Sequence, residues 1–230
     1  MRMRRLAAAA LLALLAACSA PDYTPVRDWA RGASIAADYP AAAQGVPASA
    51  EDGILAMQEA LVTWLSALGR MADDAVLPYL DDPFLGLAAR AGAADPRGAE
   101  AVAALGRTLR HASRNNLRAP ALRETIRGSD AQVQALVAAL SEAVARGGRP
   151  AEGAAAAPTP AAVPAAGDAR ARYRALLAQV AQGHAMLKER AGEITGEETV
   201  QRIRAAEDQL RRAARTLPLP SAPLPAAAAP

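Results

Sequence analysis

The clearest pattern along the chain is an apolar stripe that begins soon after residue 49. Apolar side chains recur there every three or four residues, the spacing of one buried face of an α-helix: Ile54, Met57, Leu61, Trp64, Leu65, Leu68 and Met71. Ser49 and Asp52 stand where a capping box would start this helix, and no proline follows before Pro78. We therefore predict a long amphipathic helix that begins near Ser49 and ends before Pro78.

Several more helices are predicted within residues 49–148. At two places an aspartate precedes a proline, the order typical of a helix start: Asp82-Pro83 and Asp95-Pro96. The first of these helices should run to about residue 90 and the second to about residue 114. A short helix over residues 119–127 should close at Gly128, and Ser129 should then cap a further helix that ends at Gly147.

Residues 168–217 are predicted to form an antiparallel helical hairpin. Asp168 can cap the first helix, and Thr195 to Glu198 resembles a capping box for the second. The first helix has one apolar face: Tyr173, Leu176, Leu177, Val180, His184 and Leu187. The connection is only a few residues long, so the two helices should run in opposite directions and pack on the helical region of residues 49–148.

Three segments lack a helical pattern. Prolines at positions 21, 25, 40 and 47 predict a flexible tether over residues 18–48. Residues 149–167 have the Ala/Pro-rich composition of a linker, and residues 218–230 that of a disordered Pro/Ala-rich tail. With 3% aromatic residues and abundant alanine, the fold class is predicted to be all-α, a bundle of about five or six helices.

The first 17 residues have the pattern of a secretory signal peptide, with arginines at positions 2, 4 and 5 and an uncharged apolar run from Leu6 to Ala17. The sequence Leu15-Ala16-Ala17-Cys18 resembles the lipobox of bacterial membrane lipoproteins. The resemblance implies cleavage between Ala17 and Cys18 and attachment of lipid, including palmitate, to Cys18. Because Ser19 rather than aspartate follows, it also implies the outer membrane, facing the periplasm. The alternative is a chance or buried cysteine beside an ordinary signal peptide.

Charge argues against a nucleic-acid partner. Three of the 26 basic residues and none of the 23 acidic residues lie before Cys18, so cleavage there leaves a chain without net charge. Such a chain has no electrostatic basis for binding DNA or RNA. Acidic residues prevail before residue 100 and basic residues after it. Either acidic and basic helices face each other within the fold, or the surface docks a charged partner.

Two groups of side chains are candidates for ligand or metal chemistry. Asp73, Asp74, Asp81 and Asp82 cluster in sequence, and paired carboxylates can hold a cation or act as acid and base. Helix ends and pairing with nearby arginines account for them more simply. His184 lies on the apolar face of its helix without a metal-ligating residue four positions away, so we interpret it as an interior histidine with a hydrogen-bonded ring.

The predicted function is non-enzymatic. The sequence has no motif of a catalytic serine, a phosphate-binding loop or a zinc site, and it has no second cysteine. No cofactor or metal site is predicted. Residues 173–187, with Gly183-His184, are loosely similar to helical lipoproteins of Gram-negative bacteria, a similarity that implies no activity. We expect a lipid-anchored envelope protein that binds a protein partner or supports an assembly. The alternative is a periplasmic module that binds a small ligand or a metal through the four aspartates or His184.

Overall fold

The computed structural model describes residues 21–79, 81–147 and 163–218, and the predicted lipobox lies outside them. This part of the chain contains seven α-helices and no strand, so the predicted all-α fold class is confirmed. The helices are α2 (Thr24–Ala37), α3 (Ala48–Ala72), α4 (Leu85–Ala94), α5 (Pro96–Arg114), α6 (Leu122–Arg146), α7 (Val163–Glu189) and α8 (Glu197–Ala214). Short 3-10 turns cover Pro40–Ala43, Ala119–Ala121 and Ala191–Glu193.

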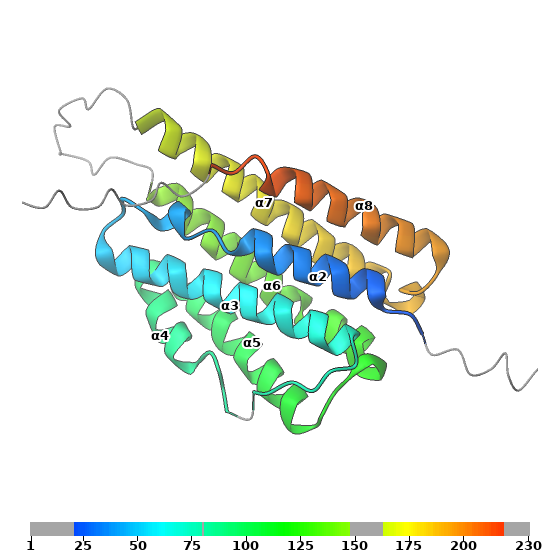
Figure 1. The fold of residues 1–230 in the computed structure, drawn as a ribbon. Coiled ribbons are helices and arrows are strands. Elements are labelled where there is room, and N and C mark those ends of the chain that lie inside the picture. Colours follow the sequence, from blue (N-terminus) through cyan, green and yellow to red (C-terminus); the bar gives the residue numbers. More distant parts are fainter. Residues whose placement is uncertain (1–20, 80, 148–162, 219–230) are drawn as a thin grey trace, which may run out of the picture.

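Helix α3 is the centre of the bundle. It packs against α2, α4, α5 and α6, while α7 packs against α6 and α8 (Figure 1). Helix α2 lies between α3 on one side and α7 and α8 on the other. The first and last helices of the described chain are therefore neighbours, although more than 150 residues separate them in sequence.

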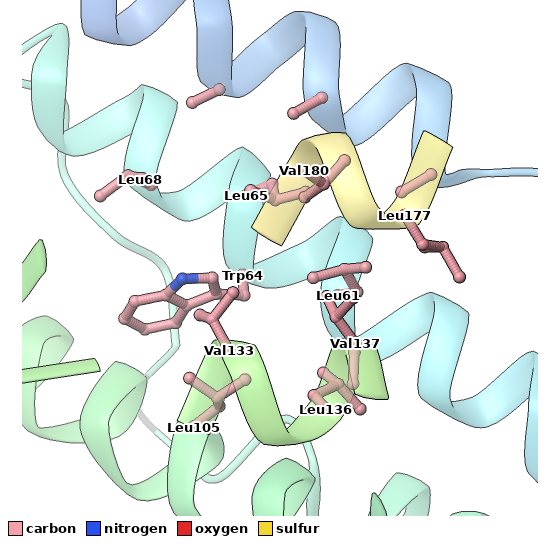
Figure 2. Packing of buried hydrophobic residues seen from close by; sticks show 14 of the residues in the cluster. Leu61, Trp64, Leu65, Leu68, Leu105, Val133, Leu136, Val137, Leu177 and Val180 are labelled. Carbon is pink, nitrogen blue, oxygen red and sulfur yellow. The ribbon is translucent and has the colours of Figure 1, made fainter. Parts of the chain in front are cut away.

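The predicted stripe of α3 is confirmed as the main core surface, because all seven of its apolar side chains are buried. Leu61, Trp64 and Leu65 of α3 meet side chains from three other helices (Figure 2). These are Leu105 of α5, Val133, Leu136 and Val137 of α6, and Leu177 and Val180 of α7. Each such side chain contributes about 1.5–3 kcal/mol by leaving water.

The prediction of a flexible tether over residues 18–48 is wrong for most of that range. Residues 24–37 form α2, and Trp29 is completely buried in the core. Pro25 lies in the first turn of α2, where a proline costs no hydrogen bond, and Pro40 begins a 3-10 turn. The prolines thus mark the starts of elements and interrupt none.

The predicted break at Gly128 is also wrong, because α6 runs without interruption from Leu122 to Arg146. No atom of the described residues lies within 4 Å of the position that a Cβ at Gly128 would take, so this glycine makes no close contact, and the helix continues through it. The Ser129 hydroxyl donates a hydrogen bond to the carbonyl oxygen of Thr125 at 2.7 Å, as a serine inside a helix does. Two predicted helices are therefore one.

Side-chain capping was predicted more often than it occurs. Asp95 caps α5 by accepting a hydrogen bond from the backbone N–H of Arg97 at 2.9 Å, as predicted. Helices α3 and α8 begin without a side-chain cap, so neither Ser49 nor Thr195 has the predicted role. Asp168 lies inside α7, which begins at Val163 and so includes the last five residues of the predicted linker.

The C-terminal hairpin is present as α7 and α8, joined through the short turn at Ala191–Glu193. Its apolar side chains, including Tyr173, Leu187 and Ile203, belong to the same core as those of α3. The Tyr173 hydroxyl donates a hydrogen bond to the carbonyl oxygen of Ala37 at 2.8 Å, so α7 also fixes the end of α2. Residues 219–230 of the predicted tail and 149–162 of the predicted linker lie outside the described residues.

Candidate functional site

The four candidate aspartates do not converge on one site. Asp73 accepts hydrogen bonds from Arg27 at 3.2 Å and from Arg31 at 2.9 Å, which ties the end of α3 to α2. These two guanidinium groups, Arg27 first, hold the pKa of Asp73 below its ordinary value. The carboxylate is 41% exposed, so solvent screens both ion pairs.

The other aspartates serve the backbone or face solvent. Asp74 has a left-handed backbone with φ of 52°, and its carboxylate accepts the backbone N–H of Ala119 at 3.4 Å. Asp82 accepts the backbone N–H of Phe84 at 2.9 Å and so orders the entry to α4, and Asp81 is exposed. In the part of the chain that the structure describes, no three His, Cys, Asp or Glu side chains form a possible metal site.

His184 is part of a buried polar cluster between α6 and α7. Its side chain is 0% exposed, and its Nδ1 lies 3.0 Å from the Oδ1 of Asp130. Gln134 donates a hydrogen bond to the same oxygen at 3.1 Å, and Lys188 donates one to the Oδ2 of Asp130 at 2.9 Å. The interpretation of His184 as an interior histidine with a hydrogen-bonded ring is confirmed.

Asp130 is the hub of this cluster. The hydrogen bond from His184, supported by Lys188 and Gln134, keeps the pKa of Asp130 far below its ordinary value, although burial acts in the opposite direction. Gln134 also donates to the carbonyl oxygen of Ala181 at 2.9 Å, so the cluster joins side chains of α6 to the backbone of α7. The Nε2 of His184 is buried and has no hydrogen-bond partner among the described residues.

The chemistry of this cluster is that of a cross-link between two helices. A carboxylate on one ring nitrogen fixes the orientation of the imidazole. The neighbouring Gly183 packs directly against Trp29, because a Cβ placed there would lie only 2.6 Å from the indole ring. The histidine is thus enclosed by α6 on one side and approached by α2 on the other.

A surface groove between α2 and α8 is the described feature best suited to hold a ligand or a partner. Its wider part, about 420 Å³, is lined by Asp28, Arg31, Gly32, Ile35 and Ala36 of α2 and by Glu207, Leu210, Arg211 and Ala214 of α8. A narrower part of about 240 Å³ continues towards the start of α2, between Thr24, Pro25 and Asp28 on one wall and Arg204, Glu207 and Asp208 on the other. The order of these residues shows that α2 and α8 run in parallel.

Charged residues on both walls are held in place by local ion pairs. Arg31 is bound to Asp73 of α3, and Glu207 accepts a hydrogen bond from Arg211 one turn further along α8. Asp28 accepts a hydrogen bond from the Nε of Arg27 at 2.9 Å. Both walls of the groove therefore carry charged side chains that are paired with neighbouring residues.

The sequence interpretation missed both the groove and the partner of His184. Val26, Trp29, Ala30, Ala33 and Ala37 recur every three or four residues, and this spacing could have revealed α2 despite its prolines. Asp130 follows a serine taken as a cap, and no signal in the sequence pairs it with a histidine 54 positions away. That pairing depends on the packing of α6 against α7.

No protein family, curated protein or solved structure matches this chain. Within residues 21–79, 81–147 and 163–218, no helix is both long enough and apolar enough to cross a bilayer. A proposal for function therefore rests on the residues of the chain itself.

Proposed function

We propose that the chain is an envelope lipoprotein, anchored to a bacterial membrane through lipid on Cys18, whose helical bundle binds a protein partner without catalysis. The sequence Leu15-Ala16-Ala17-Cys18, the arginines before it and the absence of any other cysteine support the anchor. The outer membrane, facing the periplasm, is the proposed location, because Ser19 follows the cysteine. The α2–α8 groove, with Ile35 exposed beside it, is the observation that carries partner binding.

The proposed anchor would keep the bundle close to the membrane. Helix α2 begins at Thr24, and the described body begins at Pro21. Three residues of extended chain span at most about 11 Å, so Pro21 would lie within that distance of the lipidated Cys18. Two or three acyl chains make such attachment durable, whereas one chain binds reversibly.

The anchor is tested by replacing Cys18 with serine in the full chain and fractionating the cells that express it. We expect the wild type to sediment with membranes and to show the added mass of lipid, and Cys18→Ser to do neither. Ser19→Ala serves as the matched control, because it changes a neighbouring residue and keeps the thiol. Membrane attachment of Cys18→Ser without a lipid mass would show the anchor to be wrong.

Partner binding is tested by placing a photo-crosslinking amino acid at Ile35 or at Leu85 in the anchored protein. Both side chains are similarly exposed, 77% and 76%, but only Ile35 lines the groove. We expect one discrete crosslinked species from position 35 and none from position 85. Equal crosslinking at both positions would contradict a specific groove.

The second candidate function, a small-ligand or metal site at the four aspartates or at His184, has less support. Asp73 is already paired with two arginines, and Asp130 already occupies the Nδ1 of His184. A ligand at either place would have to displace these partners. A partner protein in the α2–α8 groove would not have to displace them.

A further inference from the structure

Arginine side chains are concentrated on the hairpin that α5 and α6 form. Residues 101–129 hold six arginines and a single acidic residue, Glu124. We call them the hairpin arginines: Arg107, Arg110, Arg114, Arg118, Arg123 and Arg127. Arg107, His111 and Arg114 are separated by four and three residues, so they share one face of α5, and all three are exposed.

Several hairpin arginines lack the ion pairs that neutralise arginines elsewhere in the bundle. Many of the other arginines are bound to a carboxylate, as Arg31 is to Asp73 at 2.9 Å. No carboxylate of the described residues forms such a pair with three of the hairpin arginines: Arg107, Arg110 and Arg127. Their charge is therefore available to an anionic partner.

The acidic residues near the hairpin do not cancel its charge. Asp73, at the end of α3, is already bound to two arginines of α2. Asp74 and Asp82 lie beside the hairpin, against its connection and against α5. Even when Asp74, Asp81 and Asp82 are counted with Glu124, six arginines face four carboxylates, a net charge of +2.

The hairpin lies at the end of the bundle where α2 begins (Figure 1). The guanidinium carbon of Arg123 lies 6.0 Å from the centre of the Tyr23 ring. Tyr23 follows Cys18 by five residues, and five residues of extended chain span at most about 18 Å. Lipid on Cys18 would therefore bring the hairpin arginines to the membrane surface.

The second hairpin at this end of the bundle, formed by α7 and α8, has the opposite charge (Figure 1). Residues 188–198 hold two cations and four exposed glutamates: Glu189, Glu193, Glu197 and Glu198. Helix α2 packs against α7 and α8, whereas Tyr23 at its start contacts α6. An anionic surface would thus attract one side of the anchored end and repel the other.

We propose that the α5–α6 hairpin is a docking surface for anionic phospholipid headgroups. Its guanidinium groups bind the headgroup phosphates, and the bundle lies with this hairpin against the bilayer and with the α7–α8 hairpin turned away. This inference rests on the proposed function in placing the chain at a membrane, and it adds the lipid chemistry and the orientation. Helix α8 packs on α2 and α7, so the α2–α8 groove stays accessible to a partner.

The test uses the mature chain, residues 18–230, with Cys18→Ser so that no covalent lipid contributes. This chain has no net charge, so its attraction to an anionic surface requires a local concentration of cations. Binding is measured by sedimentation with vesicles of phosphatidylcholine, either alone or with about 30% phosphatidylglycerol, at low and high salt. We expect binding to the anionic vesicles to be at least about tenfold stronger and to fall as salt rises.

Two matched double substitutions locate the docking surface. Arg107→Gln with Arg127→Gln removes two exposed charges of the hairpin and should weaken binding by about tenfold or more, because each basic residue near an anionic surface strengthens binding by about fivefold. Arg212→Gln with Arg215→Gln removes two exposed charges near the end of α8 and should change binding less than about twofold. Circular dichroism checks that each variant is folded.

A fluorescent label reports the orientation of the bound chain. The Cys18→Ser chain has no cysteine, so His111→Cys or Gln201→Cys places a single label at an exposed position of α5 or of α8. With a quencher attached to the lipid headgroups, we expect strong quenching at position 111 and little at position 201. Equal quenching at the two positions would contradict the orientation.

Three outcomes of the binding experiments would overturn the docking surface. They are equal binding to the two kinds of vesicle, binding that does not depend on salt, and equal effects of the two double substitutions. Tighter binding to polyglutamate than to the anionic vesicles would likewise assign the hairpin to an acidic protein segment.

The Cys18 anchor is tested separately from this docking surface. Electrostatic binding is reversible and is lost at high salt, so a high-salt wash of cell membranes leaves lipid-anchored protein only. Failure of the anchor is read from such membranes and from the lipid mass, whereas failure of the docking surface is read from the unlipidated chain.

Discussion

Removing the carboxylate of Asp130 should destabilise the bundle strongly, because three other side chains depend on it. Asp130→Ala deletes the acceptor of His184, Gln134 and Lys188 at once. His184 is completely buried, so both of its ring nitrogens would then lack a partner. Lys188 is 49% exposed and can turn its ammonium group to water.

The magnitude follows from burial. Leaving a buried hydrogen-bond donor without its acceptor costs about 1–3 kcal/mol, and a typical further hydrogen bond, such as that of Gln134, contributes about 1 kcal/mol. Most of this loss falls on the His184 side, since the exposed Lys188 contributes about 1 kcal/mol or less. We therefore expect Asp130→Ala to lower the free energy of unfolding by about 2–4 kcal/mol, a large share of the roughly 5–15 kcal/mol of a typical domain. At about 2–4 °C per kcal/mol, Tm should fall by about 4–16 °C.

The assay is urea unfolding at pH 7 followed by circular dichroism, with Asp208→Ala as the control. Asp208 is 60% exposed and only 3.8 Å from Arg211, so its loss should cost less than about 1 kcal/mol. A loss below about 1 kcal/mol for Asp130→Ala would refute the reasoning, because removing a buried acceptor of three hydrogen bonds should cost more than removing one exposed ion pair.

The stabilisation by Asp130 should also depend on pH in one direction. Its pKa is lowered in the folded state, so its contribution is complete above the unfolded pKa of about 4 and is lost as the pH falls towards the lower, folded pKa. The difference between wild type and Asp130→Ala should therefore be largest near neutral pH and shrink below about pH 4. A difference that grows on acidification would contradict the assigned hydrogen bonds.

Two further substitutions test the placement of α2. Gly183→Ala puts a Cβ 2.6 Å from the ring of Trp29 and should lower the free energy of unfolding by about 1–3 kcal/mol in urea titrations. Its control, Gly128→Ala at an exposed position of α6, should raise that free energy by up to about 1 kcal/mol. Equal effects of the two substitutions would contradict the close packing of Gly183 against Trp29. Trp29→Ala should cost about 3–5 kcal/mol and lower Tm in calorimetry, whereas Ile35→Ala on the exposed face of the same helix should stay within about 0.5 kcal/mol. If Trp29→Ala lowered the free energy of unfolding by less than about 1 kcal/mol, residues 21–48 would be a tether rather than part of the core.

Hydrophobic periodicity predicted the helices that carry large apolar side chains. The α3 stripe from Ile54 to Met71 is buried as expected, and the α7 face that includes Tyr173 and Leu177 joins the same core. It failed for α2 because four of the eight buried residues of that helix are alanines. Alanine is weakly hydrophobic, and it occurs throughout this chain, so its spacing stands out poorly in the sequence.

Local rules for helix ends were less reliable than the apolar pattern. Asp95 caps its helix because its carboxylate faces a free backbone N–H at a chain reversal. Ser129 has the residue type of a cap but continues a helix, since packing of α6 against α3 and α7 outweighs the local preference of Gly128 and Ser129 to end it. Tertiary contacts also decide the candidate site, where Asp130 and His184 come together only through two helices that are distant in sequence.

Helix α2 begins at Thr24, only six residues after Cys18, and this short distance leads to a last prediction that links the proposed anchor to the proposed partner. Through Trp29 and the ion pairs of Asp73, α2 is fixed to the body, and it also forms one wall of the groove. With lipid on Cys18, the end of the groove beside Thr24 would be held near the bilayer, and a partner would have to reach it there. A flexible Gly/Ser spacer of about 30 residues between Ala20 and Pro21 would let the body move by about 30 Å.

We expect this spacer to reduce crosslinking from position 35 in cells, because the groove would leave the layer in which the partner segment lies. The free energy of unfolding of the unlipidated chain should not change, since the bundle itself is intact. An equally long spacer after Pro218, at the other end of the described body, controls for added length. Unchanged crosslinking with the spacer before Pro21 would show that the partner reaches the groove from the aqueous phase, and that closeness of α2 to the lipid has no part in recognition.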